Sequence, residues 1–434
     1  MSHQIGSCTN PPAEPCRTWG EILPDGTQLE LVRKSALGPP EILGWDGRTA
    51  TTALQFACSG QIYEPTFIHP SILNRTHLPT HAAPYGSAKK LFDEISNAFL
   101  ANFNLTDASA ALLTASAISS WFATCFAVAP CLSIVTSTTS EAVRVLRFLS
   151  CFCYHPLRLG ALSRNDLLNL PMQLQPTLLI NGTGLNKGAH TLLNVSNHRG
   201  VFVQKDGSLV DLYCAKVVAG VHHATFLEGA LHVTIDPPQL IQTSPFDDDA
   251  EEELARRFQP RLLRYRLENW DRVARSLFDA PEFISPTREI ARTLGMCLVD
   301  DELQKNISAL LLDRDRELRG NRSLDFPATV IEALLAFCHE TGTDSIHVKD
   351  ITLGARAILE ARGENAELSY ESVGLILKNL GLHTAKLDRN GKGLELREET
   401  RKRIHHLAIQ YDIETAASKG VRLCQYCTGD GCSK

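Results

Sequence analysis

The stretch CLSIVTSTTSEAVRVLRF, Cys131–Phe148, sets the interpretation of the whole chain. Its first residues form a short apolar run typical of a buried strand, and from Thr139 onwards the apolar residues have helical spacing. A strand, a turn and a helix in this order make up the phosphate-binding unit of many nucleotide-binding proteins. The turn, Thr136–Ser140, has no glycine and no lysine, so the outline of a phosphate loop is present without its usual chemistry.

A working phosphate loop needs glycines whose N–H groups surround the phosphates, a lysine for the β and γ oxygens, and a hydroxyl for magnesium. Here Glu141 lies where an anion would meet the helix N-terminus, and a carboxylate there repels phosphate. The hydroxyls of the turn can hydrogen-bond an anion, or they can simply cap the helix. Both interpretations stay open for the following residues: Thr136, Ser137, Thr138, Thr139 and Ser140.

The segments around this unit predict an α/β fold. Strand-like runs such as PTLLI, AKVVAG and LHVTID alternate with helical patterns, which predicts a parallel sheet with helices on both faces. We expect five regions: 1–85, irregular or β-rich; 86–245, the sheet domain; 246–345, helical; 346–415, a winged helix; and 416–434, a tail with cysteines.

Composition limits the class of protein. The 434 residues are 44% hydrophobic and 21% charged, as in globular proteins with several domains. The net charge of -6 gives no general attraction for nucleic acid, so DNA binding requires a local basic patch. No residue between 108 and 140 is charged, but its Ala, Ser and Thr content and Pro130 favour a buried helix and strand over a membrane span. The 13 cysteines and the polar N-terminus indicate reduced thiols in the cytoplasm.

The C-terminal part has the pattern helix, helix, two-stranded ribbon, helix, which is the order of a winged helix. The recognition helix would be 369–380 and the wing 386–394. Between Lys378 and His406 there are eight Lys or Arg residues and four Asp or Glu residues, a local positive excess. We expect phosphate contacts with DNA from Lys378, Lys386, Arg389, Lys392, Arg397, Arg401 and Arg403.

The order of these segments, together with RFQPRLLRYRLENW and LILKNLGLHTAKLDRNGKGLEL, resembles P-loop ATPase-like proteins of phages, plasmids and other mobile elements. These are helicase-like, primase-associated proteins with a C-terminal winged helix. The resemblance implies a P-loop NTPase-like core in which Thr136–Ser140 stands for the Walker A turn, and 177–180 for the Walker B strand. The acidic pair after that strand is replaced by Asn181 and Gly182. The sensor strand would be 216–219, and the arginine expected after it is missing from FLEGALHVTI.

These losses remove phosphate cradling, metal binding and charge neutralisation together. The resemblance therefore implies a pseudo-ATPase, DNA-associated and acting in the replication or regulation of a mobile element, with a homo-oligomer or a replication protein as partner. Two alternatives stay open: an active ATPase or helicase with a non-standard phosphate loop, and an interaction scaffold that binds no DNA. The alternative phosphate loop would use Gly182, Gly184, Lys187 and Gly188, with ATP and magnesium as cofactors.

Two further patterns carry chemistry. The helix RRFQPRLLRYRLENWDR holds six arginines, which either pair with nearby acidic residues or contact phosphates. The tail CQYCTGDGC presents Cys424, Cys427 and Cys432, three thiols of a zinc site that His405 or His406 would have to complete.

Overall fold

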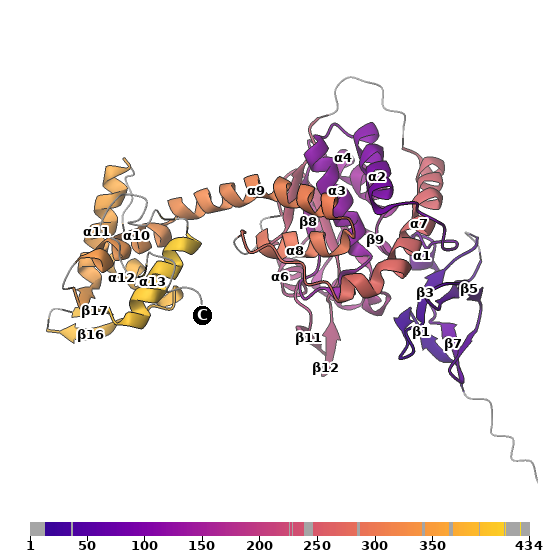
Figure 1. Ribbon diagram of the computed structural model, residues 1–434, viewed down its shortest axis with the longest axis horizontal. Coiled ribbons are helices and arrows are strands. Elements are labelled where there is room, and N and C mark those ends of the chain that lie inside the picture. Colours follow the sequence, from indigo (N-terminus) through magenta and orange to yellow (C-terminus); the bar gives the residue numbers. More distant parts are fainter. Residues whose placement is uncertain are drawn as a thin grey trace, which may run out of the picture. The chain divides into compact units, whose positions relative to one another are not determined.

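The structure is a computed structural model that describes residues 14–35, 38–224, 226–227, 229–237, 246–283, 287–340, 343–363, 368–389, 391–411, 413 and 426. Of residues 313 and 317–324 it describes only the helical backbone. The chain divides into two compact units, Met1–Leu311 and Leu312–Lys434 (Figure 1), and we describe each by itself. The five finer regions expected from the sequence remain predictions.

The first unit begins with a small β region made of two sheets. The sheet of order β2-β3-β4-β5 is antiparallel, and the sheet of order β1-β7-β6 is mixed. The strands are β1 (Cys16–Thr18), β2 (Glu21–Ile22), β3 (Gln28–Val32), β4 (Glu41–Trp45), β5 (Ala50–Ala53), β6 (Phe56–Cys58) and β7 (Gln61–Pro65). A Cβ at Gly44 would lie 2.2 Å from the ring of Phe56, so glycine lets the two sheets approach each other. The short helix α1 (Pro70–Leu73) follows.

A five-stranded parallel sheet forms the centre of the first unit, with the order β14-β8-β13-β10-β9. Its strands are β8 (Cys131–Val135), β9 (Pro156–Leu159), β10 (Thr177–Asn181), β13 (Lys216–Gly220) and β14 (Leu231–Thr234). Helices cover both faces of the sheet. The residues of β10 show this, because successive side chains point to opposite faces and belong to different hydrophobic cores. Leu179 belongs to the core with α2 (Ala88–Asn102), α3 (Asp107–Ser120) and α4 (Thr139–Ser150). Leu178 and Ile180 belong to the core with α6 (Lys187–Val195). The sequence-based expectation of a parallel sheet flanked by helices is thus confirmed.

The remaining elements of the first unit connect or cover this sheet. Between the strands lie α5 (Arg164–Leu168), the 3₁₀ turns η1 (Ala123–Cys125), η2 (Met172–Leu174) and η3 (Gly182–Gly184), and the hairpin β11 (Phe202–Lys205) and β12 (Ser208–Asp211). After the sheet come α7 (Asp248–Ala274), α8 (Thr287–Cys297) and α9 (Asp301–Leu324), the last of which runs across the boundary between the units.

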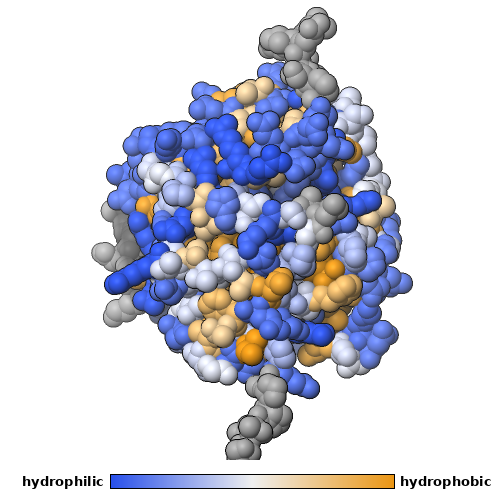
Figure 2. Space-filling view, turned by 90° about the vertical axis from the view of Figure 1, so that its right-hand side faces the viewer, coloured by the Kyte–Doolittle hydropathy of each residue, from blue (hydrophilic) through white to orange (hydrophobic). Residues whose placement is uncertain are grey.

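The uncharged segment 108–140 forms most of α3 and all of β8, both in the core of the first unit. No helix within the described ranges is long and apolar enough to cross a membrane. The face drawn in Figure 2 is mainly hydrophilic with small, separate apolar patches, a distribution that ordinary protein surfaces have.

The described part of the second unit contains, after the end of α9, four helices and a three-stranded antiparallel sheet of order β15-β17-β16. In chain order the elements are α10 (Phe326–His339), β15 (Ser345–His347), α11 (Val348–Ala361), α12 (Tyr370–Asn379), β16 (Ala385–Asp388), β17 (Gly391–Glu395) and α13 (Glu398–Gln410). Helix α10 packs against α11 and α13, and their buried leucine, isoleucine and valine side chains form a core separate from that of the first unit.

Candidate functional site

The first candidate site is the edge of the parallel sheet where β8, β10 and β13 end. Val135 pairs with Gly220, and Ala219 pairs with Asn181, so the three carboxyl ends meet. The chain changes direction at β8, because β9 lies on one side of it, beyond β13 and β10, while β14 lies on the other side. Open α/β sheets bind ligands at such crossover points. The expected nucleotide loop and Asn181 are therefore at the same edge of the sheet, with the end of β13 between them.

The turn after β8 is closed by its own side chains. Thr138 caps α4 by accepting a 3.1 Å hydrogen bond from the amide of Glu141. The carboxylate of Glu141 in turn accepts hydrogen bonds from the amide (3.1 Å) and the hydroxyl (2.7 Å) of Ser137. The amide of Thr136 donates to the carbonyl of Gly220 at 2.9 Å. Three amides that a phosphate would need are thus already used, and a carboxylate occupies the helix N-terminus.

The alternative phosphate loop is likewise explained by packing. Asn181 accepts hydrogen bonds from the amide (3.2 Å) and the hydroxyl (2.8 Å) of Thr183. A Cβ at Gly184 would lie 2.1 Å from the carbonyl oxygen of Gly160, so this glycine allows two backbone segments to touch. Lys187 is exposed at the first position of α6, where Asn186 is the cap. Gly188 follows it on the exposed surface.

Five of the six arginines on α7 are ion-paired. Arg257 and Arg261 both contact Glu94 of α2, at 3.1 and 2.6 Å. Arg256 and Arg264 pair with glutamates one turn away on α7 itself. Arg266 is buried and pairs with Glu30 of β3 at 2.6 Å. These ion pairs therefore stabilise α7 and its contacts with neighbouring elements. They leave few of its arginines unpaired for contact with phosphate.

One acidic residue of the same helix, Glu251, is surrounded by basic side chains. Glu251 is 4% exposed and lies 2.8 Å from His77, 2.8 Å from Arg147 and 2.7 Å from Arg158. Burial alone would raise the pKa of this carboxyl, but the hydrogen bonds from His77 and Arg147 and the charge of Arg158 outweigh it and lower the pKa to about 2. Glu251 thus remains ionised as the centre of a structural cluster.

The second candidate site lies in the second unit and depends on how α12 ends. Ser369 and Ser372 form a capping box at its start. At its end Gly381 has φ +73°, Leu382 donates its amide to the carbonyl of Leu377 at 2.8 Å, and Gly381 donates to Lys378 at 3.1 Å. This is a Schellman motif, which requires a residue in the left-handed conformation and so favours glycine. It turns the chain from α12 into the hairpin β16–β17.

The hairpin carries three exposed cations, which we call the wing cluster: Lys386, Arg389 and Lys392. Lys386 of β16 and Lys392 of β17 are cross-strand partners in the register. Like charges at directly opposed positions destabilise a hairpin. Within the described residues, no carboxylate pairs with any of the three. Among the residues that the structure describes, the wing cluster therefore has positive charge without an anionic partner.

The other predicted DNA contacts differ in availability. Lys378 is exposed on the last turn of α12. Arg397 is exposed and contacts Glu395 at 2.5 Å, and Arg403 donates to the carbonyl of Leu380 at 3.2 Å. Arg401 is fully engaged by backbone carbonyls, those of Leu396 (3.0 Å), Cys338 (2.7 Å) and Thr343. Arg401 therefore holds α13 against the rest of the unit, and we leave it out of the proposed interface.

The predicted zinc ligands Cys424, Cys427 and Cys432 lie outside the described residues. His405, offered as a further ligand, is buried with its Nε2 3.2 Å from that of His339. Of the described His, Cys, Asp and Glu side chains, no three come close enough together to hold a metal ion.

No protein-family model matches the chain. No curated protein matches it either. Among solved structures, the apo C-terminal region of NrS-1 is 11% identical, with 85% of this chain and 96% of that chain covered at a TM-score of 0.34. The structure of Drosophila ORC bound to DNA is 12% identical, with 76% and 89% covered at a TM-score of 0.18. Scores this low define neither a family nor a common fold, so function has to be argued from the chain's own geometry.

Sequence patterns did not reveal the pairing of Lys386 with Lys392 or the partners of the arginines on α7. The lysine pair had a detectable signal, since RNGKG between two short strands predicts a hairpin whose flanking residues face each other. The ion pairs had none, because Arg266 and Glu30 are 236 residues apart in the chain.

Proposed function

We propose that this chain is a DNA-associated protein in which the second unit is a winged helix that contacts the DNA backbone. The first unit is a degenerate P-loop-like domain that serves as a scaffold or an oligomerisation surface. The context that the sequence resemblance implies is replication or regulation of a mobile genetic element, in the cytoplasm.

The wing cluster is the observation that carries the DNA proposal. Lys386 and Lys392 face each other across the hairpin, and Arg389 lies close to its turn. Such a pair lowers the stability of the hairpin unless an anion lies between or beside the two charges. DNA phosphates supply closely spaced anions, and their neutralisation releases counterions. Lys378 and Arg397 extend the same unit's exposed positive charge.

The element order supports a winged helix. Helix, strand, helix, helix, and a two-stranded ribbon follow one another from α10 to β17, with β15 completing the sheet. Helix α12 would then be the helix presented to the groove. Its exposed residues are mixed, with Leu375 59% exposed beside Glu371 and Lys378, so most of the electrostatic affinity would come from the wing.

The scaffold half of the proposal is supported by the closed turn after β8. The carboxylate of Glu141 holds the amide and hydroxyl of Ser137, where phosphate oxygens would have to bind. Asn181 has no charge to hold magnesium, and its amide oxygen is already used by Thr183. We therefore expect the purified full-length chain to hydrolyse no ATP, with or without DNA, and the Lys187→Ala variant to behave identically. Hydrolysis that disappears in that variant would favour the alternative loop.

Anisotropy of labelled duplex DNA, titrated with the full-length chain across a salt series, tests the DNA proposal. Each phosphate contact contributes a slope of roughly 0.9 to the dependence of log K on log salt. Replacing Lys386, Arg389 and Lys392 together by alanine should therefore lower the magnitude of the slope by about 2.7 and weaken binding roughly 500-fold near 0.1 M salt.

A charge-matched control removes three other exposed cations of the same unit, Lys349, Arg362 and Lys402, again by alanine. Two of these already pair with glutamates, so the slope should change by less than about 1. Equal losses in both triple variants would contradict the assignment to the wing. No binding of the wild-type chain at about 50 mM salt would contradict DNA binding altogether and favour a protein-interaction scaffold.

A further inference from the structure

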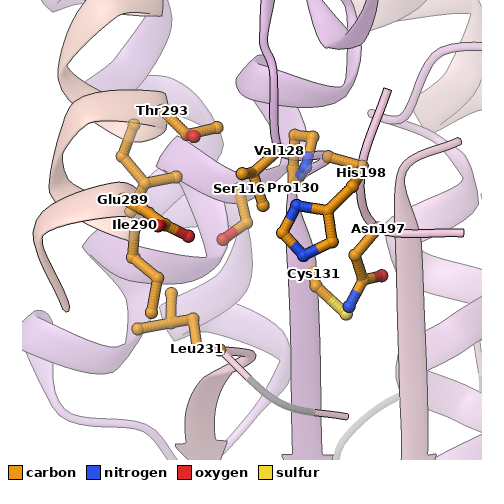
Figure 3. A pocket seen from close by; sticks show the side chains of 13 residues that line it. Ser116, Val128, Pro130, Cys131, Asn197, His198, Leu231, Glu289, Ile290 and Thr293 are labelled. Atoms are coloured by element: carbon orange, nitrogen blue, oxygen red, sulfur yellow. The ribbon is translucent and has the colours of Figure 1, made fainter. Parts of the chain in front are cut away.

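We propose that a cavity at the opposite, amino-terminal edge of the parallel sheet binds a small zwitterion of the aliphatic amino acid class. The cavity has a volume of about 220 Å³ and lies between α3, α8 and the beginnings of β8 and β14 (Figure 3). It uses none of the residues of the DNA proposal, so the two proposals stand or fall separately.

One wall of the cavity is supported by a buried positive charge. Lys216, the first residue of β13, is 1% exposed, and its ammonium donates to the carbonyl of Ser196 (3.0 Å) and to Oδ1 of Asn197 (2.7 Å). No carboxylate among the described residues neutralises this ammonium. A buried charge without a counter-ion costs several kcal/mol in effective terms, which favours an anion nearby. Pro130, Cys131 and Ser116 line both this cavity and the water-sized space beside Lys216.

Asn197 both accepts a hydrogen bond from Lys216 and lines the cavity. The side chain is 3% exposed, and because its oxygen accepts from Lys216, its N–H₂ group is left as a donor. Figure 3 shows the amide nitrogen turned towards Cys131 and the ring of His198 standing beside it. Two side-chain donors, with a positive charge behind them, suit a carboxylate group.

The other wall carries an acceptor. Glu289 lies in the first turn of α8, and Figure 3 shows its carboxylate facing the cavity, which Ser116 also lines. Over the described ranges Glu289 has no cationic partner. A carboxylate and a hydroxyl together suit an ammonium group of the ligand.

Aliphatic side chains line the rest of the cavity, namely those of Val128, Pro130, Leu231, Ile290 and Leu294. The complement of this arrangement is a small zwitterion whose carboxylate and ammonium contact the two polar walls and whose remaining surface is apolar. Free leucine fits this description, because its α carbon carries both charged groups and its isobutyl group is apolar. Burial raises the pKa of the Cys131 thiol to about 11, so this thiol is neutral near pH 7 and adds no charge to the cavity.

Calorimetric titration of the full-length chain with three probes tests the charge pattern. Leucine should bind with a Kd below about 1 mM. Leucinamide lacks the carboxylate and 4-methylpentanoate lacks the ammonium, so each should bind at least about tenfold more weakly. Absence of saturable leucine binding at about 10 mM, or equal affinities for the three probes, would overturn the proposal.

A variant pair locates the site. Glu289→Gln should weaken leucine at least about tenfold but leave the affinity for 4-methylpentanoate unchanged, because that probe has no ammonium to lose. Glu302→Gln is the matched control: Glu302 is likewise an exposed glutamate in the first turn of a helix, α9, outside the cavity. Circular dichroism checks that both variants are folded. Leucine affinity that is unchanged in Glu289→Gln, or lowered equally in Glu302→Gln, would contradict the assignment.

Discussion

The helix α7 and the hairpin β16–β17 are both basic in sequence, but they differ in whether their positive charges are paired with carboxylates. On α7 five of the six arginines pair, with Glu94, Glu30 and two glutamates of the helix itself. On the hairpin, Lys386 faces Lys392 and neither has a carboxylate partner within the described residues. The number of cations in a segment therefore does not give the positive charge that it can offer to an anionic partner, because paired cations are already neutralised.

The comparison also separates structural from functional charge in energetic terms. Paired charges on α7 are expected to contribute to folding and nothing to DNA binding. The unpaired charges on the hairpin are expected to reduce stability slightly and to supply affinity. Substitutions that change one quantity without the other can break or sharpen this distinction, and three follow in order of their expected effect on the free energy of unfolding.

The largest effect is expected from the buried pair of Arg266 and Glu30. The carboxylate of Glu30 also accepts a 2.8 Å hydrogen bond from the hydroxyl of Tyr154. Glu30→Ala leaves the guanidinium buried without its anion, which should cost about 3–5 kcal/mol. All four tryptophans precede residue 312, so tryptophan fluorescence during urea unfolding reports the first unit. DNA affinity of the folded variant should be unchanged.

Two further variants show whether charge burial causes this loss. Glu252→Ala breaks the exposed pair with Arg256 and should cost no more than about 0.5 kcal/mol. The double replacement Glu30→Leu with Arg266→Met removes both charges, and should be clearly more stable than Glu30→Ala. A double variant that is as unstable as the single one would show that packing, not the uncompensated charge, dominates.

An intermediate effect is expected for Glu251 as pH falls. The pKa of Glu251 is about 2 in the folded chain, below its ordinary value of 4.5, so its stabilising contribution is complete above pH 4.5 and is lost as pH falls towards 2. We expect about 1–2 kcal/mol once screening by water is included. Urea midpoints of wild type and Glu251→Gln should therefore differ at neutral pH and converge across this window. A difference that is independent of pH would contradict the ionised cluster.

Local sequence patterns predicted the local parts of this fold. The apolar runs that gave β8, β10 and β13, the hydroxyl cap of α4 and the turn of the β16–β17 hairpin all depend on residues close together in the chain. The closure of the turn by Glu141 was predictable in part, because that residue lies only four positions after Ser137.

The remaining features depend on contacts between distant segments. Arg401 could be counted as a cation from the sequence, but its three carbonyl partners include Cys338, 63 residues away. The cavity that Glu289 lines brings together α3, α8 and two strands, and no pattern within one segment encodes it. Strand order within the sheet and partners of buried charges are set by packing across the whole unit, so they became visible only in the structure.

The smallest effect on stability is expected at the hairpin β16–β17, where stability and the proposed DNA affinity should move in opposite directions. Lys392→Glu places opposite charges at directly facing positions and should stabilise the hairpin by about 0.2–1 kcal/mol, measured by hydrogen exchange of amides in β16 and β17. The same change removes one phosphate contact and neutralises Lys386, so the salt slope of DNA binding should fall by about 1.8. Lys392→Ala, which only removes one charge, should relieve the repulsion and lower the slope by about 0.9.

If Lys392→Glu stabilised the hairpin while leaving DNA affinity unchanged, the lysine pair would carry no DNA contact. If it destabilised the hairpin, the two side chains would already share a bound anion or point apart, and the contrast with α7 would lose its physical basis.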